Sequence, residues 1–180
     1  MKPSLQFKIE LFRTKKPIWR RFIVPETISL KKFHEVIQVV MGWENYHLYS
    51  FTFGREVFSA WTEEEEENAE KKLTKEIIAK FFAKPGACGQ YEYDPGDGWS
   101  HIIVLEDFCQ AVEQKYLCLD GAMACPPEDV GGLQGYADFC KEVKARKAGK
   151  GNPSIARWHP DYEPTAFDLE EINSRLKMIR

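Results

Sequence analysis

The stretch Gly89–Glu106 holds two runs in which apolar and polar side chains alternate, and it constrains the fold more than any other. Tyr91 and Tyr93 form the first run, and Trp99–Leu105 forms the second. Side chains two residues apart lie on the same face of a β-strand. Asp94–Gly98, between the runs, combines Pro, Gly and Asp, which tight turns favour. The stretch therefore predicts a hairpin with two carboxylates at its tip.

The rest of the chain repeats this arrangement of strands and adds helices. Alternation predicts strands over 5–11, 18–24 and 48–53, with a short return strand at 57–58. The pattern over 107–119 fits either a helix or a loop. Hairpins with helices between them indicate an α+β protein, with a mainly antiparallel sheet built from hairpins and packed against about three to five helices. Apolar residues at helical spacing predict helices over 30–41, 73–82 and 168–179, and one from Tyr136 into the basic run Lys141–Lys150.

Two of these helices have recognisable ends. Ser29 is a predicted N-cap, because its hydroxyl can accept a hydrogen bond from a first-turn amide, and Gly42 is predicted to end the same helix. Asp168 and Glu171 form a predicted capping box at the start of the last helix. That helix is expected to bury a stripe made of Leu169, Ile172, Leu176 and Ile179.

The length of the chain fits one domain. It has 180 residues, of which 43% are hydrophobic, and this size and composition predict a single globular domain spanning 1–180. Within it, glutamates make 62–72 an expected solvated loop, since like charges repel and cannot be buried together. The segment 149–166 is the expected linker before the last helix.

Charge and hydropathy narrow the classes of partner. The net charge of −3 does not favour a nucleic-acid partner, although Arg20, Arg21 and the lysines after residue 140 leave one open. The sequence holds no apolar run of about 18 residues, so no membrane span is expected. Charges near the start of the chain argue against a secretion signal. The five cysteines include no C-x-x-C pair, which is typical of reduced thiols in a cytoplasmic protein.

Two polar segments supply the candidates for catalysis. The first is the predicted hairpin, and the second is the segment Cys125–Gly132. Carboxylates next to an imidazole suit a divalent metal or general acid–base chemistry. The alternative is that the aspartates brace the turn and the histidine belongs to the core. The candidates are Asp94, Asp97, His101, Glu128 and Asp129.

Aromatic and amide side chains supply a second set of candidates, for binding. His34 and Gln38 are four residues apart on one border of a predicted helix, so they face the same way. Rings in the predicted loops could border a cleft for an unknown protein or small-molecule ligand. The alternative for each is a structural role. The binding candidates are His34, Gln38, Trp43, His47 and Trp99.

The sequence resembles the plasmid ORF-three-like family, whose members are also labelled insertion-element passenger proteins of a resolvase-like type. The resemblance rests on segments along the whole chain: 17–21, 30–38, 41–48, 91–101, 125–136 and 167–173. It implies one α+β domain, found in bacteria and archaea beside mobile elements, whose biochemical role is not established. Family members often carry a second Cys where Val130 stands here, which weakens a metal site built on a cysteine pair.

These observations lead to two expectations for function. The first is a non-catalytic binding or accessory module with an aromatic-lined polar cleft. The alternative is a metal-assisted hydrolase or nuclease that uses the carboxylates and histidine named above. A recombinase of the resolvase kind does not fit, because Ser4 lies in an ordinary strand pattern and the last helix has an exposed face of mixed charge. The sequence indicates no particular cofactor.

Overall fold

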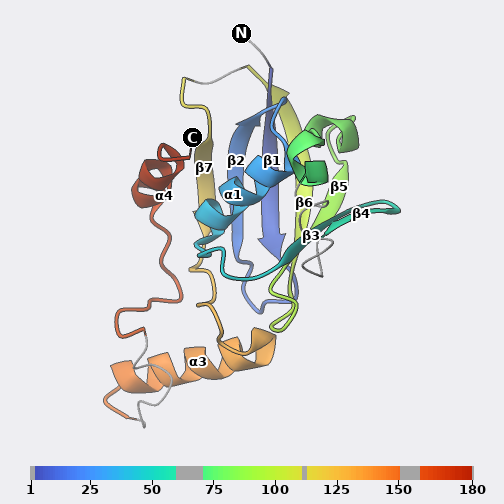
Figure 1. The fold of residues 1–180 in the computed structure, drawn as a ribbon. Coiled ribbons are helices and arrows are strands. Elements are labelled where there is room, and N and C mark those ends of the chain that lie inside the picture. Colours follow the sequence, from blue (N-terminus) through green and yellow to red (C-terminus); the bar gives the residue numbers. More distant parts are fainter. Residues whose placement is uncertain (1–2, 60–70, 111–112, 151–158, 180) are drawn as a thin grey trace.

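The computed structural model describes residues 3–59, 71–110, 113–150 and 159–179. Within these ranges a seven-stranded sheet has the order β4-β3-β5-β6-β1-β2-β7 (Figure 1). All neighbouring strands are antiparallel, so the predicted α+β class is confirmed. The strands are β1 (Ser4–Leu11), β2 (Trp19–Pro25), β3 (Tyr49–Phe53), β4 (Glu56–Ser59), β5 (Cys88–Tyr93), β6 (Trp99–Cys109) and β7 (Leu117–Ala122).

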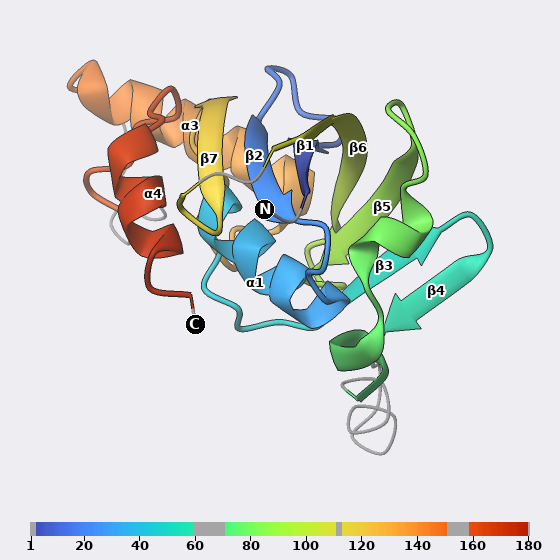
Figure 2. The ribbon, with the colours of Figure 1, turned by 90° about the horizontal axis from the view of Figure 1, so that it is seen from above.

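The helices lie on one face of the sheet and at one of its ends. In Figures 1 and 2, α1 crosses the face formed by β1 and β2, and α4 lies beside β7. In Figure 1, α3 lies below the end of the sheet where β5 turns into β6. The helices are α1 (Leu30–Met41), the short 3-10 helix η1 (Ile78–Phe81), α3 (Gly132–Lys147) and α4 (Leu169–Leu176), and residues 71–75 are also helical.

Helix α1 ends where the sequence predicts. The Ser29 hydroxyl accepts a hydrogen bond from the amide of Lys32, and Gly42 adopts a left-handed conformation at φ 97°. Its apolar stripe packs against rings from the sheet, with Phe33 between Phe7 and Phe51. This packing forms the centre of the core, because all three phenylalanines are fully buried.

The predicted helix over 73–82 is wrong in its middle. The chain is helical over 71–75, becomes extended at Ile77, and then forms η1. The reason is tertiary pairing with the segment before α1: the Ile78 amide donates to the Ile28 carbonyl at 3.0 Å, and the Leu30 amide donates to the Glu76 carbonyl at 2.9 Å. These bonds replace the helical hydrogen bonds that apolar spacing alone suggests.

Strand β7 has no clear pattern in the sequence, and it forms because β2 offers an edge. Cys118 pairs with Phe22, and Gly121 with Arg20. The outer edge of β7 is covered by Asn173 of α4, whose amide oxygen accepts from the Cys118 amide at 2.8 Å and whose amide nitrogen donates to the Cys118 carbonyl at 2.9 Å. A side-chain amide thus replaces a neighbouring strand, and this protects the edge of the sheet.

Helix α4 confirms its predicted cap but not its whole predicted stripe. Asp168 accepts a hydrogen bond from the amide of Glu171 at 2.9 Å. Leu176 is buried, whereas Leu169 is 36% exposed, so the prediction that Leu169 is buried is wrong. Most of the expected acidic loop, at 62–70, and part of the expected linker, at 151–158, lie outside the described residues.

Candidate functional site

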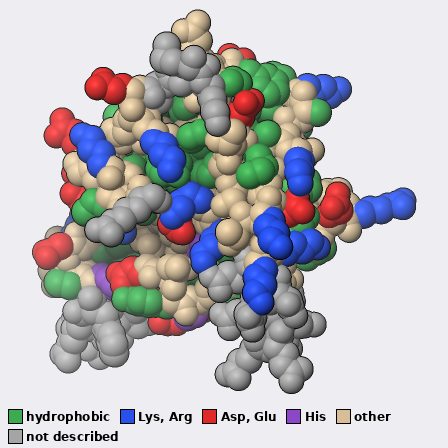
Figure 3. Space-filling model, turned by 45° about the horizontal axis from the view of Figure 1, so that its top comes forward, with side chains coloured by type: hydrophobic (Ala, Val, Ile, Leu, Met, Phe, Trp, Pro, Cys, Tyr) green, Lys and Arg blue, Asp and Glu red, His purple; other side chains and the backbone are tan. Residues whose placement is uncertain are grey.

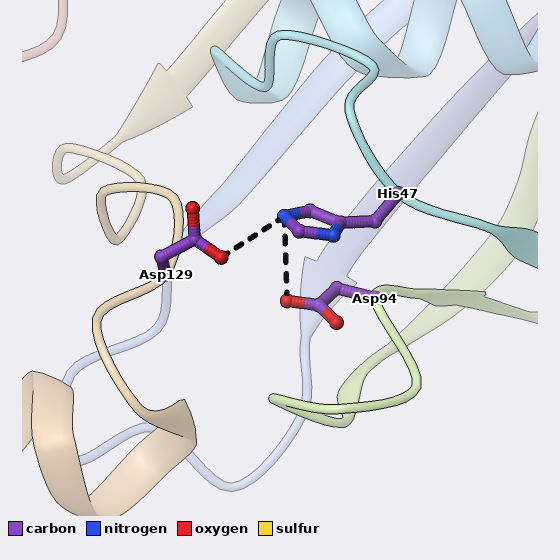
Figure 4. Close-up of side chains that lie close together, drawn as sticks. All are labelled: His47, Asp94 and Asp129. Carbon is purple, nitrogen blue, oxygen red and sulfur yellow. Dashed lines mark ion pairs between the residues drawn. The ribbon is translucent and has the colours of Figure 1, made fainter.

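Three segments that are distant in the sequence meet at one end of the sheet. They are the loop between α1 and β3, the tip of the β5–β6 hairpin, and the segment between β7 and α3. They contribute His47, Asp94 and Asp129, respectively, whose side chains point toward one another in Figure 4. The two polar segments that the sequence singles out are therefore neighbours in space, with an imidazole between them.

The imidazole of His47 is the centre of a group of side chains, the His47 cluster, whose other members are Asp94, Glu128 and Asp129. Its Nε2 atom lies 3.3 Å from Asp129 Oδ1, 3.7 Å from Asp94 Oδ2 and 3.8 Å from Glu128 Oε2. These separations exceed the lengths of ordinary N–H···O hydrogen bonds, which are about 2.7–3.2 Å. Nε2 is shielded from solvent and has no hydrogen-bond partner in the described part of the chain.

Glu128 is fixed through one of its two oxygens. Its Oε1 atom accepts from the Glu44 amide at 2.7 Å and from the Tyr93 hydroxyl at 2.9 Å. Burial of Tyr93, together with this carboxylate, raises the pKa of the Tyr93 hydroxyl, which therefore stays protonated and donates. The other oxygen, Oε2, is buried without a hydrogen-bond partner among the described residues. Glu128 thus presents one free carboxylate oxygen toward His47.

The two aspartates of the hairpin tip have different surroundings. Asp94 adopts a left-handed conformation at φ 51°, and its Oδ1 atom accepts from the Gly96 amide at 2.9 Å. Its Oδ2 atom is the one that faces His47. Asp97 does not belong to the group of mutually close donors, and its Oδ2 atom accepts from the Gly131 amide at 3.0 Å. Asp97 thereby joins the hairpin tip to the start of α3.

His101 lies apart from the carboxylates. It is fully buried on β6, where its Nδ1 atom is 3.2 Å from the Tyr91 carbonyl. Burial lowers the pKa of His101 from 6.5 to about 4, so the ring is neutral near neutral pH. Its Nε2 atom has no hydrogen-bond partner in the described ranges. The structure brings three of the predicted catalytic candidates to His47 and places His101 in the core.

The predicted binding residues other than His47 are interior residues. Trp43 and Trp99 are buried and pack on each other, with ring centroids 5.6 Å apart. His34 and Gln38 do face the same way, as predicted, but they face the buried hydroxyl of Tyr91, each at 2.8 Å. These four side chains hold the elements around the site in place and do not line a cleft.

One hollow with described walls lies on the outer face of the sheet. Its volume is about 150 Å³. None of its walls belongs to the His47 cluster. Lys8, Glu10, Phe12, Ile102 and Val104 line it.

Oxygen and nitrogen donors make the His47 cluster a candidate metal centre. One atom each from His47, Asp94 and Asp129 lies within 4.8 Å of the other two. Cys125 does not belong to this group of mutually close donors. The three carboxylates around His47 give the cluster a strongly negative potential. The arrangement is therefore suited to a bound cation.

The basic run on α3 is partly neutralised within the molecule. Lys141 pairs with Asp138 at 2.7 Å, Lys147 pairs with Glu163, and Arg146 donates to the Pro160 carbonyl. Arg146 and Lys147 also lie in the last turn of the helix, where they complement the helix dipole. On the face in Figure 3, acidic and basic side chains are intermingled. These pairings leave less basic charge for a nucleic-acid contact than the sequence alone suggests.

Arg20, named above as a possible nucleic-acid contact, is a buried charge instead. Arg20 is 3% exposed, and its guanidinium donates to the carbonyls of Val40, Ala122 and Met123. Burial lowers its pKa, and these carbonyl oxygens hold the cation. An arginine on the apolar face of a predicted strand was the available signal. Its role is to join α1, β2 and the segment after β7.

Comparisons with known proteins place the chain in a family. The family model described as plasmid pRiA4b ORF-3-like protein matches residues 3–171. The chain belongs to this family. It is 35% identical over 173 residues to the uncharacterized protein y4hQ of Sinorhizobium fredii, covering 94% of this chain and 88% of that protein. The resemblance inferred from the sequence is confirmed.

The family fold is also present in a solved structure. A protein of unknown function from Methanosarcina mazei Go1 superposes with a TM-score of 0.76 at 25% identity, covering 95% of this chain and 98% of that one. The plasmid pRiA4b ORF-3-like relatives named here have no stated activity, so function has to be argued from the site. Among the described helices, none has the length and apolar character that a membrane crossing requires.

Proposed function

We propose that this member of the plasmid pRiA4b ORF-3-like family is a non-catalytic binding module whose ligand is a cation held by the His47 cluster. The observation that supports this most is the unpaired state of buried atoms there. His47 Nε2 and Glu128 Oε2 are shielded from solvent and lack hydrogen bonds to described residues. Buried polar atoms normally have partners, so an unpaired pair at one place points to a bound group.

The negative charge of the cluster favours a positively charged ligand. Asp94 and Glu128 have side chains only 9% and 12% exposed, so water screens their charges poorly. Asp129, with 75% of its side chain exposed, forms the outer rim. A cation at this point would relieve the repulsion among these carboxylates. It would also link the three segments through one bound group.

Metal-assisted hydrolysis is the second candidate, and one observation favours it. The free oxygen of Glu128 lies beside a set of three donor atoms, which resembles metal centres that keep one position open for water. The charge disfavours the nuclease version. Two aspartates would balance one dication, and Glu128 and Asp97 would then leave the site negative, which repels phosphodiesters.

Cation binding can be tested by thermal melting and calorimetry of the full chain. We expect a dication to raise the melting temperature, because a ligand that binds only the folded state stabilises it by about 2.7 kcal/mol at a hundredfold excess over Kd. Asp129→Asn should abolish this response, and asparagine tolerates the left-handed backbone of Asp129, at φ 54°. His159→Ala and Asp161→Asn are matched controls on exposed residues away from the cluster.

The proposal fails if neither inorganic nor organic cations change the melting temperature of the wild-type protein. It also fails if Asp129→Asn and Asp161→Asn respond equally to a cation. For hydrolysis, ester and phosphodiester probes with and without the metal provide the comparison. Activity that depends on the metal and is lost in His47→Ala would favour the second candidate over the first.

A further inference from the structure

The spacing of the donor atoms carries information about which cation fits. Ligand atoms about 2.0–2.2 Å from a tetrahedral zinc ion lie about 3.3–3.6 Å from one another. His47 Nε2 lies 3.3 Å from Asp129 Oδ1 and 3.7 Å from Asp94 Oδ2. Octahedral magnesium, with ligands at about 2.0–2.1 Å, requires neighbouring ligand atoms to lie about 3 Å apart. Both distances from His47 Nε2 are wider than magnesium requires.

The identity of the donor atoms excludes the other common dication. Calcium has longer bonds, about 2.3–2.6 Å, which would also fit the spacing, but it takes oxygen ligands. The central donor here is the imidazole nitrogen of His47. Imidazole with carboxylates suits zinc and neighbouring transition metals. Spacing and donor type together favour one class of metal.

We infer that the His47 cluster is a transition-metal site of the zinc type, with His47, Asp94 and Asp129 as ligands and a fourth position open to a small molecule. This inference rests on the proposed function and makes it specific. Glu128 lies outside the group of three mutually close donors, although its Oε2 atom is 3.8 Å from His47 Nε2. Its Oε1 atom is held by Glu44 and Tyr93. Oε2 therefore faces the fourth position as a hydrogen-bond acceptor.

The acceptor beside the fourth position selects the class of small molecule. A ligand whose metal-binding atom also carries a hydrogen can donate to Glu128 Oε2 while it binds the metal. Water, alcohols, amines and hydroxylamines have this property. Anions such as azide lack the hydrogen, and the carboxylate charges repel them. The site is thus built for neutral hydroxyl or amino compounds.

Cobalt(II) is a suitable probe, because its visible spectrum reports its ligands. We expect the full chain to bind one Co²⁺, with affinity reduced at least tenfold in His47→Ala and in Asp129→Asn but unchanged in His159→Ala. Mg²⁺ and Ca²⁺ should compete poorly. Hydroxylamine should alter the spectrum at concentrations at which azide does not.

Glu128→Gln tests the fourth position directly. The side-chain oxygen must stay where Oε1 accepts two hydrogen bonds, so the amide nitrogen takes the place of Oε2 and presents a donor. We expect Co²⁺ affinity within about threefold of wild type, a weaker response to hydroxylamine and a stronger one to azide. This exchange of preference would not follow from a purely structural role.

The outcomes separate the inference from the function on which it rests. If Glu128→Gln loses Co²⁺ as fully as His47→Ala does, Glu128 is a fourth protein ligand and the open position is refuted, while cation binding stands. If Mg²⁺, Ca²⁺ or an organic amine binds more tightly than Co²⁺, the metal class is refuted and cation binding again stands. If no cation binds, both are refuted.

Discussion

The Nδ1 atom of His34 lies 2.8 Å from the hydroxyl of Tyr91, in the interior between α1 and β5. This contact is part of a closed ring of hydrogen bonds. Gln38 Nε2 donates to the Tyr91 hydroxyl at 2.8 Å, and His34 Nε2 donates to Asn45 Oδ1 at 2.6 Å. The backbone N–H of Asn45 donates to Gln38 Oε1 at 2.8 Å. The ring fixes the His34 tautomer and attaches the loop that carries His47 to the core.

Removing the Tyr91 hydroxyl should destabilise the protein. Tyr91→Phe leaves His34 Nδ1 and one Gln38 N–H buried without a partner, which costs about 1–3 kcal/mol. We expect a lower urea midpoint with an unchanged m-value. Tyr46→Phe is the matched control, because Tyr46 is 68% exposed. Equal midpoints for the two variants would show that the hydrogen-bond ring contributes nothing.

Stability should decrease as the pH falls from 6.5 toward 4. Burial lowers the pKa of both His34 and His101 from 6.5 to about 4. Within this window the unfolded chain therefore binds more protons than the folded chain, so a fall in pH favours unfolding. Each histidine contributes on the order of 3 kcal/mol that is present above pH 6.5 and is lost by pH 4.

Denaturant titrations between pH 4.5 and 7.5, combined with NMR of the imidazole signals, would check this window. His101→Leu should reduce the slope of stability against pH, because it removes one of the two groups. Imidazole signals of His34 and His101 that titrate near pH 6.5 in the folded protein would contradict the prediction.

Arg20 should be irreplaceable by lysine. Its Nε atom donates to the Val40 carbonyl at 2.8 Å, and its two terminal nitrogens reach Ala122 and Met123 at 2.9 Å each. Lysine presents a single ammonium and cannot span these oxygens, so Arg20→Lys should cost about 2–4 kcal/mol. Arg13→Lys, in the β1–β2 turn, serves as the control in the same denaturation experiment. If Arg20→Lys loses no more stability than Arg13→Lys, the bridging role of Arg20 is refuted.

The sequence predicts those features that local chemistry determines. Alternation places Tyr91 and Tyr93 on one strand, and Asp94 with Gly98 forms the expected turn, in which the Gly98 amide donates to the Asp94 carbonyl at 2.7 Å. Ser29 and Asp168 cap helices as their residue types predict. In each case the two hydrogen-bonding residues are only a few positions apart, so one short stretch of sequence contains both of them.

Features that depend on distant pairing could not be predicted in the same way. Strand β7 forms only because β2 provides its partner, and Ile77 is extended only because Ile28 is beside it. The meeting of His47 with Asp129 depends on how two loops pack across the end of the sheet. Spacing gave no reason to choose His47 over His101 as the imidazole near the carboxylates.

Gly132 should be essential for the contact between α3 and the hairpin tip. It has φ 66°, and a Cβ atom there would lie 2.6 Å from the Asp97 carbonyl oxygen. Gly132→Ala should therefore both strain the backbone and separate these segments, at a cost on the order of 2–3 kcal/mol. Gly54 provides a close control, because its φ is 61° and a Cβ atom there would meet nothing within 4 Å.

Both glycine variants suffer backbone strain, and only Gly132→Ala adds a backbone clash. Urea denaturation should therefore show a clearly larger loss for Gly132→Ala than for Gly54→Ala. If the two losses are the same, the close approach of Gly132 to Asp97 has no energetic role.

Cation binding should also stabilise the start of α3. Asp129 precedes the first residue of α3 by three positions, and Asp97 holds the Gly131 amide at 3.0 Å. The apolar contacts of α3 centre on a cluster of its own around Phe139 and Val143, separate from the main core. Polar contacts at its first turn therefore contribute to the position of α3, and a bound cation would add one more.

Hydrogen exchange measures this coupling. With saturating metal, we expect amide exchange over Val130–Gly135 to slow about tenfold, which corresponds to about 1.4 kcal/mol. The strand β1 should be unaffected, because it carries no residue of the site and pairs with a neighbouring strand on both sides. Asp129→Asn should remove the slowing, while Asp161→Asn should keep it. Tight metal binding with unchanged exchange at Val130–Gly135 would show that the site and α3 are not coupled.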